Sequence, residues 1–249
     1  MKKLFISIFT CVFALFALGT STFAWFSMNN EVTADGMSIT IKSGASFLLI
    51  APGTINDADD IQTLNAVSAT APVDTASASL YPVAHDAIAN TSDANTWSKW
   101  YYQYMNDPTV SMPREGNAHD QLTEKHSISS SDNYVLVNTF SLTIADGGNE
   151  MDEILVACHI VPGTGGAEAV KVLVTTENAA VEFSGQGGSD TTTNLLGSTP
   201  LSATTTLVVS VYIYWDGQDA DVHTNGIPSL KNTTVDLVFT GNVVEGVNP

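Results

Sequence analysis

The chain has 249 residues and is strongly acidic, with 8 Lys and Arg against 26 Asp and Glu and a formal net charge of −18. This excess argues against nucleic-acid binding, which needs a basic patch, and predicts repulsion from a bare anionic membrane. Hydrophobic residues make up 44% of the sequence, which suits a packed domain rather than a disordered chain.

The first residues have the layout of a secretory signal peptide. Lys2 and Lys3 precede an uncharged apolar run over residues 4–18. Small residues, Thr22 and Ala24, then occupy positions −3 and −1 of a cut after Ala24. The sequence therefore predicts a signal peptide over residues 1–24.

A second interpretation of the same segment remains open. Residues 4–26 carry no charge, and roughly 20 apolar residues are enough to span a bilayer, so the segment would then be retained as a membrane anchor. Under either interpretation Lys2 and Lys3 stay on the cytoplasmic side of the membrane, and residues 25–249 lie outside the cytoplasm. We therefore expect a secreted or cell-surface protein that contacts a membrane only through an uncleaved N-terminal segment.

From residue 37 on, strand signals dominate the sequence. Apolar and polar residues alternate, or β-branched and aromatic residues form short runs, and Gly, Pro, Asn or Asp follow each segment. This spacing, without regular amphipathic helices, predicts an all-β fold, a jelly-roll-like β-sandwich in a single domain over residues 25–249. The expected strands are Met37–Lys42, Phe47–Ile50, Tyr134–Ile144, Glu153–Val161, Ala169–Thr175, Ala180–Phe183, Leu207–Trp215 and Val235–Thr240.

One short helix is expected within the β pattern, between a cap at Ser92 or Asp93 and a stop at Asp107. Aromatic side chains recur there at helical spacing, which leaves two interpretations. The aromatic stripe packs the helix on the sandwich as a lid, or it is exposed and stacks on carbohydrate. The side chains concerned are Trp97, Trp100, Tyr101 and Tyr104.

No recognisable catalytic motif is present. The sequence contains no His-Glu-x-x-His zinc motif, no Gly-x-Ser-x-Gly nucleophile turn and no phosphate-binding Gly-x-x-x-x-Gly-Lys. Cys11 would leave with the signal peptide, so Cys158, in an apolar strand, is expected to be a buried small hydrophobe without a disulfide partner. We expect no catalytic residue and no enzymatic activity.

One acidic loop is the candidate metal site. Asp216, Asp219 and Asp221 follow the segment with the strongest strand composition and supply hard oxygen ligands of the kind that Ca²⁺ prefers. Their spacing does not match the EF-hand loop, and an ordinary acidic loop tip is the alternative. No other cofactor is expected.

A short segment at the start of the mature chain carries a family resemblance. Ala24 and Phe26 form an aromatic junction directly after the signal, and a short polar stretch leads to Ala34, Gly36 and the alternating strand Met37–Ile41. In this order the residues resemble the start of the TasA/camelysin family of secreted biofilm-matrix proteins. The match covers residues 20–41.

The resemblance implies a jelly-roll fold and assembly into extracellular fibres in which an N-terminal strand of one subunit joins the sheet of the next. The donor segment here would be residues 25–35, with Trp25, Phe26 and Val32 as anchors. Its partners would be other copies of the chain, in an oligomer or filament, and cell-surface or matrix components. Camelysin-like members have been described as metalloproteases, but the chain lacks a zinc motif.

Two other functions remain open from the sequence. A surface-anchored adhesin or carbohydrate-binding module would use the aromatic segment or the acidic loop after residue 215. A metallohydrolase is the third hypothesis.

Overall fold

The computed structural model describes residues 37–43, 48–71, 82–104, 124–128, 134–161, 170–185, 189–190, 192–217 and 234–243. All of them belong to one unit of the chain, Ala34–Pro249. The signal-peptide prediction, with its cleavage residues Thr22 and Ala24, lies outside the described residues, as does the donor segment 25–35 with its predicted anchors. Within the described residues, no helix is long and apolar enough to cross a membrane.

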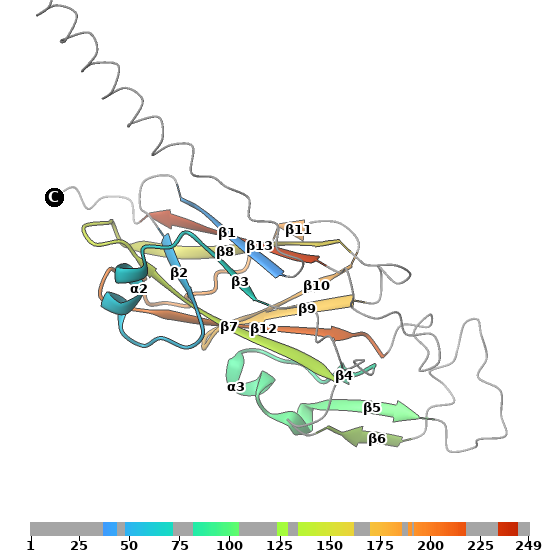
Figure 1. Ribbon diagram of the computed structural model, residues 1–249. Helices are drawn as coiled ribbons and strands as arrows, with labels where there is room; N and C mark the ends of the chain where they lie inside the picture. Colours follow the sequence, from blue (N-terminus) through green and yellow to red (C-terminus); the bar gives the residue numbers. More distant parts are fainter. Residues whose placement is uncertain are drawn as a thin grey trace, which may run out of the picture. The chain divides into compact units, whose positions relative to one another are not determined.

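Two five-stranded sheets form the framework of the described chain (Figure 1). The first sheet has the order β11 (Ser189–Asp190), β8 (Met151–Val161), β13 (Thr234–Val243), β1 (Met37–Ser43) and β3 (Ser68–Ala71). The second has the order β10 (Ala180–Ser184), β9 (Val170–Thr175), β12 (Leu207–Trp215), β7 (Val135–Ile144) and β2 (Leu48–Pro52). Neighbouring strands pair antiparallel, except that β1 runs parallel to β13.

The main hydrophobic core lies between these two sheets. On β13, Val235, Leu237 and Phe239 are buried, while the residues between them are only half-buried. This period of two is expected where one face of a strand packs on a core. Inward side chains of β12, such as Val211 and Ile213, pack into the same core from the second sheet. The β-rich, sandwich-like fold predicted from the sequence is confirmed.

The second sheet is covered on its outer face as well, which the burial pattern of its central strands shows. β12 is buried at eight of nine positions, with Tyr212 and Tyr214 on the face opposite the main core. A strand buried on both faces loses the alternation and becomes a continuous apolar run. This explains why residues 207–215 have the strongest strand composition of the chain.

One part of that outer face lies under α2 (Ala58–Leu64). Ile61 packs there on Leu49 and Ala51 of β2. The amide of Gln62 donates to the carbonyls of Ile144 and Ala203, at 2.8 and 2.7 Å. Asp57 caps the helix by accepting a bond from the backbone N–H of Asp59, a role that short acidic residues favour at helix starts.

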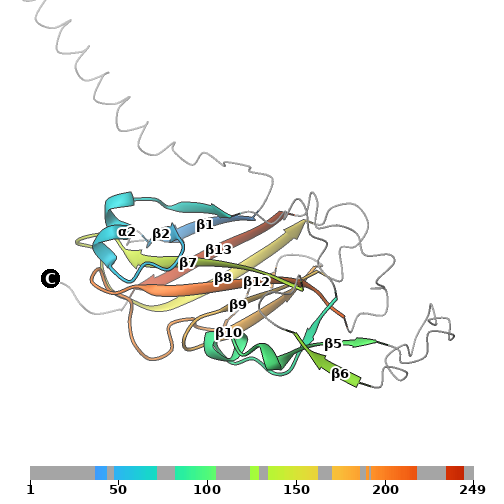
Figure 2. The ribbon, with the colours of Figure 1, turned by 60° about the horizontal axis from the view of Figure 1, so that its bottom comes forward.

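The rest of the covered face lies under a layer that we call the cover layer, residues 82–104 and 124–128. It contains β4 (Ala84–His85), α3 (Thr91–Ala94), the 3₁₀ helix η1 (Trp97–Lys99), β5 (Trp100–Tyr104) and β6 (Glu124–Ser127), and its strands form a three-stranded sheet (Figures 1 and 2). Backbone bonds join this layer to the sandwich, for example from the N–H of Val83 to the carbonyl of Trp215 at 3.0 Å.

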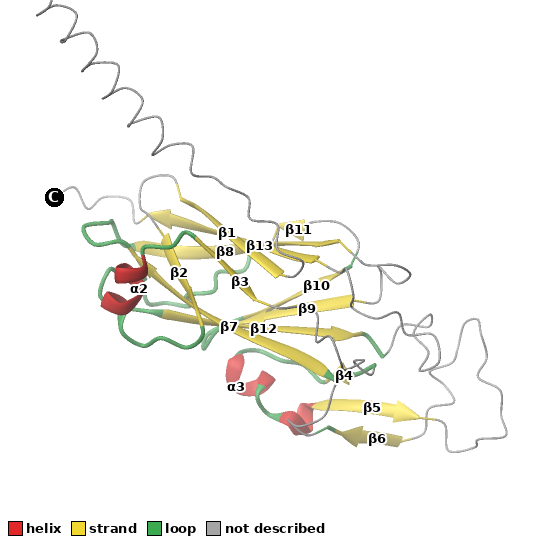
Figure 3. Cartoon of the chain, in the orientation of Figure 1, coloured by secondary structure: helices red, strands yellow, loops and turns green. Residues whose placement is uncertain are grey.

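All eight predicted strands are present, but the helix predicted over residues 93–107 is wrong. α3 and η1 are short, and from Trp100 the chain runs as β5, paired with β6 (Figure 3). The run Trp100–Tyr104 is rich in aromatic residues that favour strands, and tertiary pairing decides over an apparent helical spacing. The described chain also has three short helical segments, α2, α3 and η1, where the sequence predicted one.

Candidate functional site

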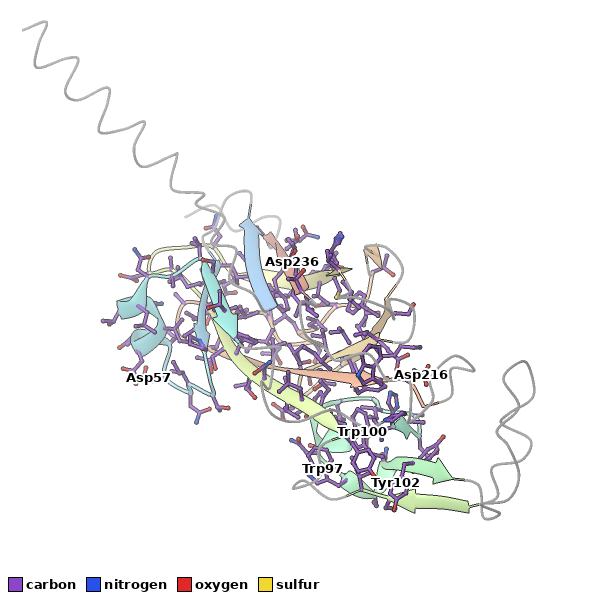
Figure 4. All side chains as sticks on the ribbon, turned by 45° about the vertical axis from the view of Figure 1, so that its right-hand side comes forward. Asp57, Trp97, Trp100, Tyr102, Asp216 and Asp236 are labelled. Atoms are coloured by element: carbon purple, nitrogen blue, oxygen red, sulfur yellow. The ribbon has the colours of Figure 1, made fainter. Side chains whose placement is uncertain are left out.

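The most concentrated polar chemistry in the described chain lies where the cover layer meets the second sheet. Outward positions of apolar strands supply three of the side chains, Lys171 on β9, Glu182 on β10 and Tyr214 on β12. His85 comes from β4. Asp216, which is labelled in Figure 4, follows directly after β12 and forms a β-bridge with Val83. We call His85, Lys171, Glu182, Tyr214 and Asp216 the polar cluster.

Glu182 is the centre of this cluster because both of its carboxylate oxygens accept bonds. Oε2 lies 2.8 Å from Nε2 of His85 and accepts from the hydroxyl of Tyr214 at 2.7 Å. Oε1 accepts from Nζ of Lys171 at 2.9 Å. The same Nζ lies 3.5 Å from Oδ2 of Asp216, so the lysine bridges two carboxylates.

His85 is held on both ring nitrogens. Besides the contact with Glu182, Nδ1 lies 2.8 Å from the carbonyl of Asp86. The imidazole also makes edge contacts with the rings of Trp100 and Tyr214, at centroid distances of 4.9 and 5.6 Å. A ring with acceptors at both nitrogens is best satisfied when both nitrogens carry protons.

These contacts shift the pKa values of the two central groups in opposite directions. Burial lowers the pKa of His85, but the bonds to Glu182 and to the Asp86 carbonyl outweigh it, and the pKa rises above 6.5. Burial raises the pKa of Glu182, but the bonds from His85, Lys171 and Tyr214 lower it to about 2. Both shifts therefore favour the charged forms, so the contacts stabilise His85 and Glu182 as an internally compensated ion pair.

The geometry of the cluster suits a structural role. A general base needs an available lone pair and a pKa near the working pH, whereas Glu182 accepts three bonds and has a pKa of about 2. Burial and the charge of Glu182 also raise the pKa of Tyr214, which keeps its proton on the phenol. The cluster connects β4 to the second sheet through charge-assisted hydrogen bonds.

Aromatic side chains surround the cluster and fix the cover layer to the sheet. Trp100 is fully buried, and its Nε1 donates to the carbonyl of Ala94 at 2.8 Å. Its ring packs on Tyr212, whose hydroxyl donates to Oδ1 of Asn95 at 2.8 Å. Trp97 is half-buried beside it (Figure 4).

The aromatic segment therefore packs on the sandwich, as the lid interpretation predicted. Trp100 and Tyr101 are buried, at 0% and 6% exposure, so neither offers a face to a sugar ring. The side chain of Tyr104 lies outside the described residues. Tyr102 remains half-buried and stacks on Tyr134, with ring centroids 5.3 Å apart and an interplanar angle of 11°.

The predicted metal site falls only partly within the described chain. Asp216 lies in the polar cluster, and its carboxylate forms an ion pair with Lys171. Asp219 and Asp221 lie outside the described residues. Within the part of the chain that the structure describes, no group of three or more His, Cys, Asp or Glu side chains is placed to hold a metal ion.

Cys158 lies where the sequence placed it. It is 2% exposed on the inner face of β8, and burial raises the pKa of its thiol to about 12. A thiol with such a pKa stays protonated and unreactive at neutral pH. The prediction of a buried cysteine is confirmed.

The polar cluster itself was not predicted. Lys171 and Glu182 are charges at alternate positions of apolar strands, and that pattern marks them as outward-facing. Their partner His85 lies 97 residues from Glu182 along the chain, and only the tertiary fold brings the two together.

Comparisons with known proteins add no relative: no family model, no curated protein and no solved structure matches the chain.

Proposed function

We propose that the chain is an extracellular structural protein that assembles into surface or biofilm-matrix fibres. Residues 25–35 of one copy add as a strand to a sheet of the next, in a jelly-roll-like subunit without enzymatic activity. The resemblance of residues 20–41 to the start of the TasA/camelysin family supports this proposal, as does the signal-peptide pattern before it. A head-to-tail contact of this kind does not close on itself and gives an open filament.

The structural observation that carries the proposal is an open sheet edge. Strand addition requires a strand whose backbone groups on one side have no partner. The second sheet ends at β10, which pairs with β9 alone among the described strands. The candidate donor directly precedes β1 in the sequence. β1 itself pairs with β13 on one side and with β3 on the other.

Electron microscopy of negatively stained protein tests the proposal. The mature chain starting at Trp25 should form filaments, and a version without residues 25–35 should stay monomeric with the same β-type circular dichroism. Well-folded monomers from both versions would contradict fibre assembly.

The second candidate is a surface-anchored carbohydrate-binding module, and the half-buried Tyr102–Tyr134 stack favours it. Parallel aromatic rings at a surface offer a platform for sugar rings. This function predicts a monomer retained on a polysaccharide column, with retention lost in Tyr102→Ala. Filaments from the purified protein alone, without such retention, would exclude it.

A further inference from the structure

We infer that the outer edge of β10 is the acceptor for an added strand, and that its occupant is segment 25–35 of a second copy of the chain. The inference rests on the proposed function and assigns the surface that completes it.

The hairpin between β9 and β10 fixes which backbone groups of β10 are free. The N–H of Thr176 donates to the carbonyl of Ala179 at 2.8 Å, which marks these residues as a hydrogen-bonded pair. Bonded and non-bonded pairs alternate along an antiparallel ladder, so Val181 and Phe183 bond to β9. The backbone groups of alternate residues then point away from the sheet; these residues are Ala180, Glu182 and Ser184.

No described residue bonds to these outward groups. The cover layer lies close by, yet its backbone bonds go elsewhere, such as from the N–H of Thr91 to the carbonyl of Thr176. Its side-chain link to β10, through His85, uses the carboxylate of Glu182, and no bond from a described residue reaches the Glu182 backbone on this side. Ser184 is exposed, and 34% of the Glu182 side chain is accessible.

The other long edges are occupied. Along β8, β11 pairs with Cys158, and the chain around Leu201 exchanges two backbone bonds with Met151, at 3.0 and 2.8 Å. On β2, the N–H of Ile50 donates to the carbonyl of Ala66 at 2.9 Å, and Pro52 has no N–H. The remaining edge strands of the described sheets are shorter: β3 and β6 have four residues each, and β4 has two. β10 thus offers five residues that have no described strand on one side.

The side-chain pattern of the proposed donor fits this edge. Val181 faces the main core from β10 but is only half-buried, so apolar side chains of an added strand would cover it. In the donor, Phe26, Met28 and Val32 fall on one face of an extended strand together with Asn30, whereas the third predicted anchor, Trp25, falls on the opposite face. That face would extend the core of the sandwich beside Val181.

Charge also favours this edge in a self-repelling molecule. With a net charge of −18, copies of the chain repel one another. At β10 the carboxylate of Glu182 is compensated by Lys171 and His85. A donor segment with two acidic residues, Glu31 and Asp35, therefore meets less uncompensated negative charge at this edge.

A proline on the open side of β10 tests the assignment. Ser184→Pro removes an outward N–H and places the ring where the added strand would lie, whereas an edge strand tolerates proline on its solvent side. In the mature chain this variant should stay monomeric with an unchanged thermal midpoint. Ser184→Ala is the matched control, because it loses the same hydroxyl but keeps the N–H, and it should form filaments like the wild type.

Hydrogen exchange gives a second measurement that does not depend on the stability of the variant. The amide of Glu182 should exchange quickly in Ser184→Pro monomers and slowly in wild-type filaments, with at least a tenfold difference in rate. Wild-type filaments in which this amide still exchanges quickly, or filaments from Ser184→Pro, would overturn the β10 assignment and leave the fibre proposal intact.

If neither the wild type nor Ser184→Ala forms filaments, the fibre proposal fails, and a peptide of residues 25–35 then tests the edge by itself. Slower exchange at Glu182 on adding the peptide supports strand acceptance at β10. Unchanged exchange with excess peptide overturns it.

Discussion

At the scale of single residues, Glu182 shows how a charge is accommodated in a mostly apolar layer. An exposed ion pair contributes little to stability, because water screens it and its side chains lose freedom. Glu182 differs in that three donors on three other elements hold it, from His85, Lys171 and Tyr214. Removing one partner therefore affects the whole cluster.

The two central pKa shifts predict a pH window for this contribution. The pKa of His85 is raised above 6.5, so its contribution is complete below pH 6.5 and is lost as pH rises through the folded-state pKa. The pKa of Glu182 is lowered from 4.5 to about 2, so its contribution is present above pH 4.5 and is lost as pH falls toward 2. The cluster should stabilise the fold most between pH 4.5 and 6.5.

Urea unfolding of the wild type and of His85→Gln between pH 5 and 9 measures the histidine part. We expect the stability difference between the two proteins to be largest at the acidic end and to shrink as pH rises. A difference that stays constant, or grows, with pH would contradict the assignment of a charged His85 in the folded state.

Two buried tryptophans provide a matched comparison of satisfied and unsatisfied donors. Nε1 of Trp100 donates to the carbonyl of Ala94, whereas Nε1 of Trp215 is buried and has no partner among the residues that the structure describes. Trp100→Phe leaves a buried carbonyl unpaired, while Trp215→Phe removes an unpaired donor. We expect Trp100→Phe to lower the free energy of unfolding, measured with urea, by about 1–3 kcal/mol more than Trp215→Phe does. Equal losses of unfolding free energy in the two variants would contradict the difference in hydrogen bonding between the two indole N–H groups.

At the scale of elements, the strands were predictable because their signal is local. Alternation in Val235–Thr240 and the apolar run Leu207–Trp215 identify a strand with one covered face and one with two. The segment after Ser92 was not predictable in the same way. Trp97 and Trp100 satisfy a helical spacing, but Trp100 lies in β5, where it pairs with His85 of β4 and packs on Tyr212, and the rest of β5 pairs with β6.

The residues of the candidate site were likewise predictable only where their signal is local. Lys171 and Glu182 could be recognised from the sequence as outward charges on apolar strands, but their joining with His85 depends on long-range topology. The predicted Asp216 does reach the cluster, through its pairing with Val83 and its contact with Lys171. Spacing along the chain carries no information about such contacts.

The cap of α2 offers a test at this scale. Asp57 accepts a bond from the N–H of Asp59, and the helix holds Gln62 against the carbonyls of Ile144 and Ala203. Asp57→Ala should lower the free energy of unfolding by about 0.5–2 kcal/mol. Asp57→Asn keeps an oxygen acceptor and should lie close to the wild type, and a similar loss in both variants would argue against capping.

At the scale of the whole molecule, the two sheets differ in what covers them. α2 and the cover layer pack on the outer face of the second sheet, while on the first sheet the outward residues of β8 and β13 remain half-buried or exposed. The open edge at β10 lies in the more heavily covered sheet. Its neighbour β9 and the next strand, β12, are thus firmly packed, which suits a strand that would accept another subunit.

Cysteine cross-linking between the proposed donor and acceptor tests the central claim most directly. Ser27→Cys and Ser184→Cys place thiols on the same polar face of the added strand and of β10, and Cys158 does not interfere because it is buried with a pKa of about 12. On mild oxidation, the mature double variant should give a ladder of covalent dimers, trimers and longer species on a non-reducing gel. Each single variant should give dimers at most. An intramolecular disulfide in a monomer, or no product from a filament-forming sample, would contradict the exchange of residues 25–35 between copies at β10.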